Sequence, residues 1–397
     1  MTEYHRKKVM NLRIKSIEVD NFKSLVNFRL DIEKFSCLIG LNGSGKSTVL
    51  QFMDFVAHLV RKENDWLKRR HWNPTDLRSK LAQKRKDIKF CIRFVDSKGA
   101  PAGRWEATYN PSSDRCTAER IDMLDWLLET EKDTVSIYDL KGNDGRKNWK
   151  TITFDYRGSY LSTYKEELLP PSILMCKKFF QETESLELLT PERLRQRTRL
   201  ANGSLGHGGR NLSAFVYELG SKGRVALAKK LKPAYRQLER VYAKQLRSGW
   251  KQLRISEIFN NVKVRTDAAH VNDGMLRVVA ILAELASTHC FLLFDEIENG
   301  INPELVEFVT DALVQASQQI FVTTHSPMIL NYLDDEVAQK GVIYLYKTVQ
   351  GHTKSIPFFS IPSLKEKLQV MGPGEAFVDT DLTKLASEIG RMQKKRG

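Results

Sequence analysis

The chain has 397 residues, a formal net charge of +15 at pH 7 and 41% hydrophobic residues. This length is enough for one main domain with a substantial insertion. No apolar run approaches the length of a membrane span, so we expect no membrane contact and a cytoplasmic protein. The five cysteines are widely spaced, and no two of them form a C-x-x-C pair. This pattern predicts buried free thiols rather than disulfides.

An N-terminal lobe is expected over residues 11–110, and its main feature is a glycine-rich turn after a predicted strand over 35–39. The segment from Gly40 to Thr48 reads GLNGSGKST and fits the pattern G-x-x-x-x-G-K-[ST]. A strand that leads through such a turn into a helix presents backbone N–H groups to phosphate oxygens. We therefore predict a nucleoside triphosphate site, with ATP as the nucleotide. The expected binding residues are Gly40, Asn42, Gly43, Ser44, Gly45, Lys46, Ser47 and Thr48. Lys46 is expected to reach the β- and γ-phosphates, and Ser47 to give its hydroxyl to Mg²⁺.

An inserted region with strands followed by basic helices is expected over residues 111–260. Strands are predicted just before it over 88–95 and 103–110, and within it as a hairpin over 134–156, around the turn residues 142–145. Between Arg193 and Arg254 the chain carries sixteen Lys or Arg residues and only two acidic ones. A second basic stretch, 61–89, carries eleven basic and four acidic residues.

Such positive charge attracts polyanions, which predicts contact with DNA, RNA or an acidic protein, although a solvated basic face is an alternative interpretation. Six residues of the first stretch have spacings that fit one helix and predict a basic helical stripe. They are Lys229, Lys232, Arg236, Arg240, Lys244 and Arg247.

A C-terminal lobe is expected over residues 261–381, followed by a tail over 382–397. A helix over 275–285 is predicted to follow Asn272, Asp273 and Gly274. The apolar strand 291–294 ends at Asp295 and Glu296, far along the chain from the phosphate loop. A second strand, 320–324, delivers His325 at its end, with Ser326 and Pro327 in the pattern of a helix start. A hairpin is predicted from 342–347 and 353–359.

This order of motifs resembles ABC-type ATPases, and most closely the SMC, RecF and OLD-like group of prokaryotic AAA-family ATPases. The segments that carry the resemblance are Ile14–Ser24 with its NFKS turn, the phosphate loop, Gly208–Ser213, Leu292–Pro303 (LLFDEIENGINP), Phe321–Pro327 and Gly372–Glu375. The resemblance implies an α/β fold: a P-loop NTPase with an ABC-type ATPase head, made of a mixed central sheet and an antiparallel β-subdomain. An inserted helical, basic subdomain would be added to this head.

The resemblance also implies roles for individual residues. Asp295 would complete the Mg²⁺ shell together with Ser47, Glu296 would orient or deprotonate the attacking water, and His325 would contact the γ-phosphate. In the same way Asn272, Asp273 and Gly274 would cap the γ-phosphate of a nucleotide held by a second subunit, so a homo-oligomer with composite ATP sites is expected. The chain departs from the family at Asn272, where serine is usual, and this departure weakens the expectation of rapid ATP hydrolysis. The glutamine of the family's next loop is not identifiable, and Gln83 is only a weak candidate.

Two functions remain open on the sequence. The chain has no long heptad segment, and the stretch after His325 is too short for the nuclease domain of OLD-like proteins, so we expect an ATPase without its own effector. The first hypothesis is a sensor or scaffold for a separate effector, most simply a nuclease, as in the ATPase subunits of the Septu, retron and PARIS anti-phage systems. The alternative is a RecF-like, ATP-dependent DNA-binding protein of repair or recombination. A transporter ATPase fits the long insertion and the NFKS start less well.

Overall fold

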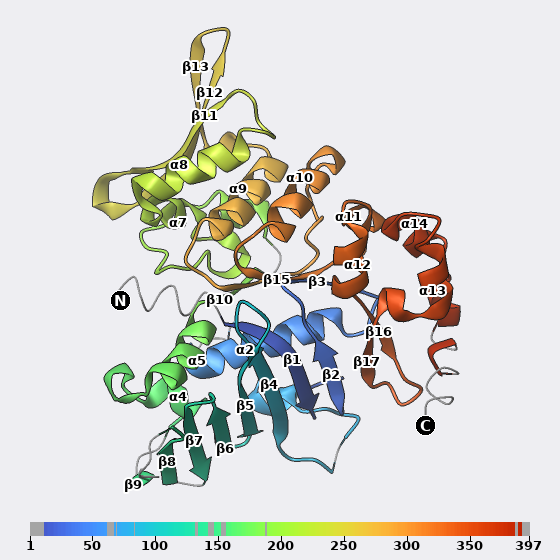
Figure 1. The fold of residues 1–397 in the computed structure, drawn as a ribbon. Helices are drawn as coiled ribbons and strands as arrows, with labels where there is room; N and C mark the ends of the chain where they lie inside the picture. The colour runs from blue at the N-terminus through green and yellow to red at the C-terminus, as the bar shows by residue number, and fades with distance from the viewer. Residues whose placement is uncertain are drawn as a thin grey trace. The chain divides into compact units, whose positions relative to one another are not determined.

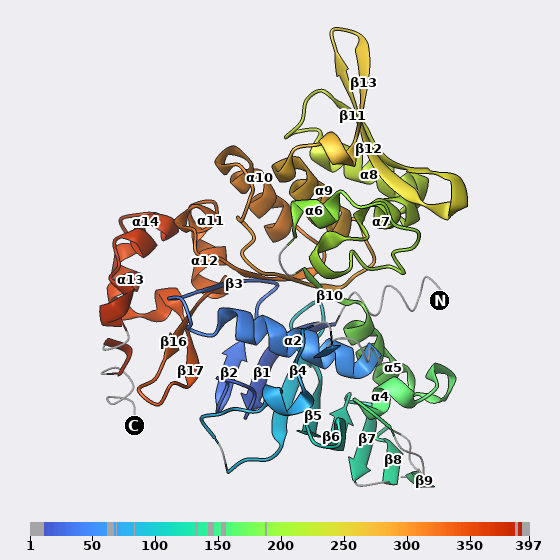
Figure 2. The ribbon, with the colours of Figure 1, turned by 180° about the vertical axis from the view of Figure 1, so that it is seen from behind.

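The protein is described here by a computed structural model, shown from opposite sides in Figures 1 and 2. The residues that it describes are 12–61, 67–68, 70–82, 84–131, 134–141, 147–151, 156–186, 189–385 and 388–390. The chain forms two compact units. The first comprises residues 1–183, 339–367 and 380–397, and the second comprises 184–338 and 368–379.

The first unit is built on an eight-stranded sheet in which every neighbouring pair is antiparallel. Its order is β2 (Phe28–Asp31), β1 (Arg13–Asp20), β4 (Ile88–Val95), β5 (Pro101–Asn110), β6 (Arg115–Asp122), β7 (Trp126–Glu131), β8 (Thr134–Asp139) and β9 (Lys147–Thr151). The strands predicted over 88–95 and 103–110 are confirmed, and so are both strands of the predicted hairpin, whose turn lies outside the described residues.

One face of this sheet is covered by helices because its strands alternate apolar and polar side chains. In β4, for example, Ile88, Phe90 and Ile92 are buried while Lys89 between them is exposed. Aromatic rings fill the covered face, with Phe90 and Trp105 packed edge to face at 5.2 Å between centroids. The helices of this unit are α2 (Lys46–Arg61), α4 (Tyr160–Thr163), α5 (Pro171–Gln181) and α13 (Pro362–Lys367).

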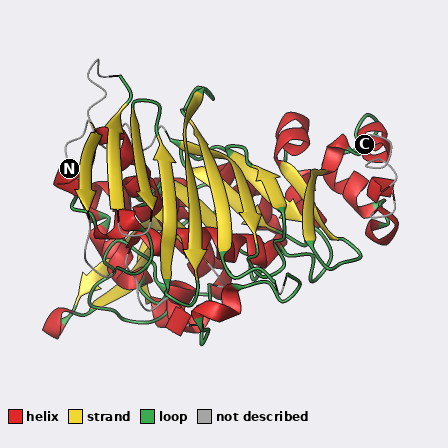
Figure 3. Ribbon diagram, turned by 90° about the horizontal axis from the view of Figure 1, so that it is seen from below, coloured by secondary structure: helices red, strands yellow, loops and turns green. Residues whose placement is uncertain are grey.

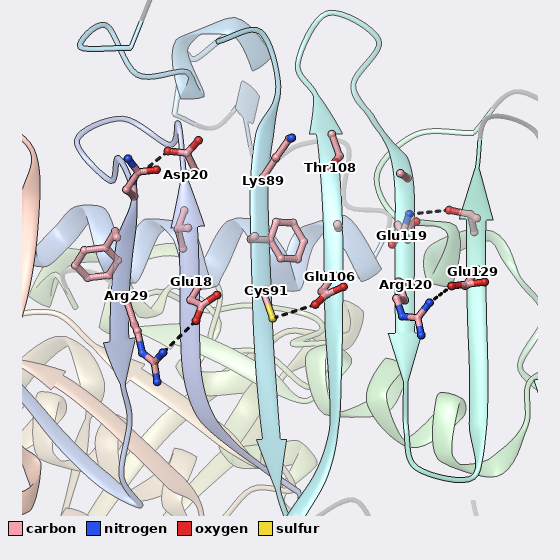
Figure 4. A pocket seen from close by; sticks show the side chains of 17 residues that line it. Glu18, Asp20, Arg29, Lys89, Cys91, Glu106, Thr108, Glu119, Arg120 and Glu129 are labelled. Carbon is pink, nitrogen blue, oxygen red and sulfur yellow. Dashed lines mark hydrogen bonds and ion pairs between the residues drawn. The ribbon is translucent and has the colours of Figure 1, made fainter. Parts of the chain in front are cut away.

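The opposite face of the eight-stranded sheet is turned to the viewer in Figure 3, and in the described part of the chain no helix covers it. It forms an open hollow lined by charged side chains from β1, β2 and β4 to β7 (Figure 4). Most of these charges are compensated across strands, as in the pairs of Arg93 with Glu18 at 2.7 Å and of Arg120 with Glu129. Paired charges of both signs are typical of a sheet face that is exposed to solvent, and they do not indicate a catalytic site.

A second group of strands in the first unit holds the phosphate loop. Strand β3 (Phe35–Ile39) is fully buried and runs parallel to β16 (Val342–Lys347). Strand β17 (Thr353–Pro357) pairs antiparallel with β16, which confirms the predicted hairpin. Helix α12 (Asp335–Gly341) precedes β16.

The second unit contains a parallel pair of strands, β14 (Phe291–Phe294) and β15 (Gln319–Thr323), beside the short strand β10 (Thr183–Leu186). Both strands of the pair are fully buried, as expected for parallel strands covered on two faces. The predicted helix over 275–285 is confirmed as part of α9. The helices are α6 (Pro191–Leu194), α7 (Leu212–Glu218), α8 (Gly220–Leu231), α9 (Asp273–Leu285), α10 (Pro303–Val314), α11 (Pro327–Asn331) and α14 (Pro373–Val378).

The basic part of the second unit is only partly helical, so the prediction of one continuous helical stripe is wrong. Helix α8 ends at Leu231, and Pro233 lies two residues further on, after the C-cap residue Lys232. Proline cannot supply the N–H that a continuing helix needs. The chain then forms a three-stranded antiparallel sheet of β11 (Leu238–Gln245), β12 (Lys251–Phe259) and β13 (Val262–Asp267). Arg240 and Lys244 therefore lie on β11, and Arg247 lies in the turn that follows it.

Two further expectations can be compared with the structure. All five cysteines are free and buried, which confirms the prediction from their spacing. Within the described ranges no helix is both long and apolar enough to cross a membrane.

Candidate functional site

The phosphate loop lies between β3 and α2 and depends on glycine at two positions. Gly40 and Gly45 have φ values of 147° and 112°, which L side chains rarely adopt. A Cβ atom at Gly40 would lie 2.4 Å from the carbonyl oxygen of Leu345, and one at Gly45 would lie 2.4 Å from Oγ1 of Thr353. The spacing of glycines in the motif therefore has a steric cause: the loop is pressed against β16 and β17.

The polar side chains of this loop include an ammonium and a hydroxyl that can donate hydrogen bonds. Lys46 is buried, with 6% of its surface exposed, and its Nζ donates to the carbonyl oxygens of Gly40 at 2.8 Å and Leu41 at 3.2 Å. The Ser44 hydroxyl is buried and forms no hydrogen bond within the described part of the chain. The first turn of α2 contains no acidic residue, and the positive end of its dipole is at this loop. A buried ammonium, an unsatisfied hydroxyl and a helix N-terminus together fit a phosphate group.

The floor of the loop is formed by two residues that the sequence did not single out for this purpose. Oγ1 of Thr353, the first residue of β17, donates to the carbonyl oxygen of Ser44 at 2.9 Å. The same atom lies 2.8 Å from Oγ of Ser24, and the backbone N–H of Thr353 donates to the Ser24 carbonyl oxygen at 2.9 Å. Thr353 therefore ties the phosphate loop to the turn after β1.

The NFKS turn is itself fixed by buried hydrogen bonds. Asn21 has φ of 66° and is fully buried, and its Nδ2 donates to the carbonyl oxygens of Arg85 at 3.1 Å and Asp87 at 2.9 Å. Asparagine tolerates this left-handed conformation better than most residues. The turn thereby places Ser24 against Thr353, which gives this recognised segment a structural role at the loop.

In the second unit, Asp295 and Glu296 follow the buried strand β14 and share one partner. Oγ1 of Thr323 donates to Oδ1 of Asp295 at 2.5 Å and accepts the backbone N–H of Glu296 at 2.9 Å. Thr323 is the last residue of β15 and is fully buried. One hydroxyl on the neighbouring strand therefore orients the carboxylate of Asp295 and fixes the backbone of the next residue.

Glu296 has an unusual backbone conformation, with φ of 47°. A non-glycine residue in this region costs about 1–3 kcal/mol and persists only where its surroundings enforce it. Besides Thr323, Asn299 enforces it, since its backbone N–H donates to the Glu296 carbonyl oxygen at 2.9 Å. The Asn299 side chain also donates to Oε2 of Glu296, at 3.4 Å. Strain of this kind, here at a half-exposed carboxylate, often occurs at functional sites.

His325 lies at the end of β15, where its ring is exposed. Its backbone N–H donates to Oε1 of Glu298 at 2.8 Å, so the loop after β14 also fixes this position. The next helix, α11, begins as predicted, with Ser326 as the N-cap residue and Pro327 in its first turn. The Gly372–Glu375 motif is explained here too, because a Cβ atom at Gly374 would lie 2.4 Å from the Pro327 carbonyl oxygen.

The start of α9 holds the remaining predicted residues. Oδ1 of Asn272 caps the helix by accepting the backbone N–H of Met275 at 2.8 Å, so the NH₂ group of its amide remains available as a donor. Asp273 pairs with Arg195, which also donates to the carbonyl oxygen of Val271 at 2.9 Å. Arg195, which belongs to the basic region, therefore stabilises the start of α9, and its charge is compensated by Asp273.

The predicted site residues fall into two sets. The phosphate-loop residues gather around the N-terminus of α2 in the first unit, and the acidic pair, His325 and the start of α9 belong to the second. Gln83 lies outside the described residues. Sequence reasoning missed Thr353, Thr323 and Glu298, whose only local signal is a small hydroxyl or carboxylate at the end of a strand or in the loop after one.

Comparison with known proteins agrees with this geometry. Residues 12–168 match a family described as an AAA ATPase domain, and residues 190–331 match one described as an AAA domain, putative AbiEii toxin, type IV toxin–antitoxin system. No match was found among curated proteins.

Two solved structures show the fold. One is an SMC head bound to the C-terminal winged-helix domain of ScpA, with a TM-score of 0.52 and 15% identity over 87% of this chain and 99% of that one. The other is an SMC head with an extended coiled coil from Pyrococcus furiosus, bound to the C-terminal domain of ScpA. It has a TM-score of 0.52 and 13% identity, over 90% of this chain and all of that one. The expected α/β fold of an SMC-type P-loop ATPase head is therefore confirmed.

Thr353 provides a test of how the loop is held. Replacing it with valine keeps the branched shape and removes the hydroxyl that donates to Ser44, at a cost of about 1 kcal/mol. We expect nucleotide affinity to fall roughly fivefold, measured by calorimetry. Thr353→Ser keeps the hydroxyl and should bind like the parent. Equal affinity of the valine variant and the parent would show that the hydroxyl does not position the loop.

Proposed function

We propose that this chain, an AAA-family ATPase of the SMC- and RecF-like ABC type, binds ATP with Mg²⁺ and hydrolyses it. The observation that carries the proposal is the phosphate loop, where a buried lysine, an unsatisfied buried hydroxyl and a helix N-terminus meet. Each of these groups favours bound negative charge.

Different residues would bind the phosphates, hold the metal ion and activate the attacking water. Lys46 and the loop N–H groups hold the phosphates and neutralise the charge that develops when the terminal phosphoryl group is transferred. The Ser47 hydroxyl and the Asp295 carboxylate are the hard oxygen ligands that Mg²⁺ prefers. When bound, the metal ion would neutralise charge on the phosphate oxygens. Glu296 orients the attacking water and takes its proton, and His325 donates to the terminal phosphate.

The proposal includes assembly. In the arrangement that the family resemblance implies, Asn272 and Gly274 contact the nucleotide of a second subunit and not the nucleotide bound by their own chain. We expect them to cap the nucleotide held by the phosphate loop of a second copy, in a two-fold dimer. Asn272 can do this while it caps α9, since its amide oxygen accepts from Met275 and its NH₂ group remains a donor. This supports ATP-dependent dimerisation despite the departure from serine.

Lys46→Ala tests nucleotide binding directly. The substitution removes the only buried ammonium of the loop, and we expect ATP binding to become undetectable by calorimetry. Lys34→Ala, which removes an exposed lysine just before β3, is the matched control and should bind like the parent. Undiminished ATP affinity of the Lys46→Ala variant would refute the assignment of the loop.

Glu296→Gln separates binding from hydrolysis. The amide cannot accept the proton of water, so turnover should fall roughly 100-fold or more while ATP affinity is retained. With hydrolysis slowed, the ATP-bound dimer should accumulate, and light scattering should show twice the monomer mass of 45.6 kDa. Unchanged turnover would place the general base elsewhere, and a monomeric mass under every nucleotide condition would contradict the composite site.

For the biological role we propose a sensor or scaffold that acts through a separate effector protein, most simply a nuclease of an anti-phage system. Support comes from the two similar SMC heads, both of which were solved with a domain of another protein bound. The test is co-expression with the product of the neighbouring gene, followed by size-exclusion chromatography with and without ATP. A stable complex supports this role. Tight ATP-dependent DNA binding by the chain alone would favour the RecF-like alternative instead.

A further inference from the structure

Helix α8 and the turn that follows it form the most one-sided charged segment of the second unit. Between Glu218 and Glu239 the sequence contains no acidic residue and six basic ones. These are Lys222, Arg224, Lys229, Lys230, Lys232 and Arg236. Elsewhere in this unit some basic side chains have acidic partners, such as Arg254 with Asp267 at 2.5 Å and Lys263 with Glu239 at 2.6 Å.

Packing separates the six residues into two groups. Leu227 and Leu231 are fully buried, and α8 contacts α9 and β11. Toward this packed side, Lys230 donates to the carbonyl oxygen of Leu285 at 3.4 Å, and burial lowers its pKa. Arg224 donates to the Tyr217 carbonyl oxygen at 2.9 Å. These two side chains are therefore bound to backbone carbonyl groups of the unit.

The other four basic residues are exposed to solvent, and the structure gives them no ion pair or side-chain hydrogen bond within the described residues. They are Lys222, Lys229, Lys232 and Arg236, which we call the α8 surface. Figure 1 shows α8 in front of strands β11 and β12, and Figure 2 shows the same unit from behind.

The dimensions of the α8 surface fit a nucleic-acid backbone. From Lys222 to Lys232 a helix rises about 15 Å, at 1.5 Å for each residue. One strand of duplex DNA carries about four phosphates over that length. Three of the four basic side chains lie along this line and Arg236 follows in the turn after the helix, so the surface could contact several phosphates of one strand.

The chemistry of the surface disfavours a protein or a membrane. Protein interfaces are poor in lysine, whereas three of the four residues of the α8 surface are lysines. A helix that lies on a lipid surface needs large apolar side chains opposite its charges, and the exposed apolar residue here is Val225, at 70%. Phosphate contacts need only positive charge on a rigid support, which α8 provides.

We propose that the α8 surface binds the phosphate backbone of a nucleic acid. This binding does not depend on the sequence of the nucleic acid, because backbone contacts position a protein without reading bases.

The experiment is a salt titration of binding to three fluorescent probes of equal length: duplex DNA, duplex RNA and single-stranded DNA. With about four contacts, affinity for the preferred probe should fall roughly 100-fold between 50 and 200 mM salt. A variant with Lys222, Lys229, Lys232 and Arg236 all changed to glutamine should bind at least tenfold more weakly at 50 mM and lose most of this salt dependence. Glutamine keeps helix propensity close to that of lysine, and circular dichroism checks the fold.

The control variant changes four exposed lysines of the first unit, Lys34, Lys98, Lys165 and Lys365, to glutamine. It has the same net charge as the α8 variant and should keep both the affinity and the salt dependence of the parent. Which of the three probes binds best identifies the kind of nucleic acid.

Three results would overturn the proposal. The first is that the parent binds none of the probes. The second is that the two quadruple variants lose equal affinity, which would point to net charge alone. The third is that polyglutamate binds the parent as tightly as the nucleic acids do, and that this binding is lost in the α8 variant. That result would point to an acidic protein as the partner.

Discussion

The close approach of the phosphate loop to the hairpin β16–β17 is the constraint on which the candidate site depends. A Cβ atom at Gly45 would collide with Thr353, and one at Gly40 would collide with the backbone of Leu345. Only glycine therefore lets the chain turn from β3 into α2 beneath these strands. The hydrogen bond from Thr353 to Ser44 then fixes the loop in the conformation that leads into the N-terminus of α2. The contacts between loop, helix and hairpin thus hold in place the groups that we propose bind the phosphates.

The same principle recurs in the second unit, where the ends of two parallel strands position the acidic residues. Thr323 at the end of β15 contacts both Asp295 and Glu296 through one hydroxyl. In return, Glu298 in the loop after β14 accepts the backbone N–H of His325. These reciprocal contacts hold Glu296 in a strained conformation, and the strain is offset by buried strands on both sides.

The sequence was most informative where chemistry demands a local pattern. The phosphate loop, the strand before it and the cap of α11 could be read directly, because glycine, lysine and capping residues have fixed local geometry. Thr353, Thr323 and Glu298 could not be identified, because their roles arise from contacts between residues far apart in the sequence. The continuous basic helix was predicted wrongly for a related reason. The spacing of charges continued past Pro233, but a proline and the alternation of apolar residues in β11 override that spacing.

The central claim is that the phosphate loop and the acidic pair, which lie far apart in the sequence, serve one nucleotide and its metal ion. Calorimetric ATP titration of Asp295→Asn, with Mg²⁺ and with EDTA, tests this most directly. An amide is a weaker Mg²⁺ ligand than a carboxylate, so the variant should bind Mg²⁺–ATP at least tenfold more weakly than the parent and metal-free ATP equally well. If the variant binds Mg²⁺–ATP as tightly as the parent, Asp295 does not hold the metal and the claim is contradicted.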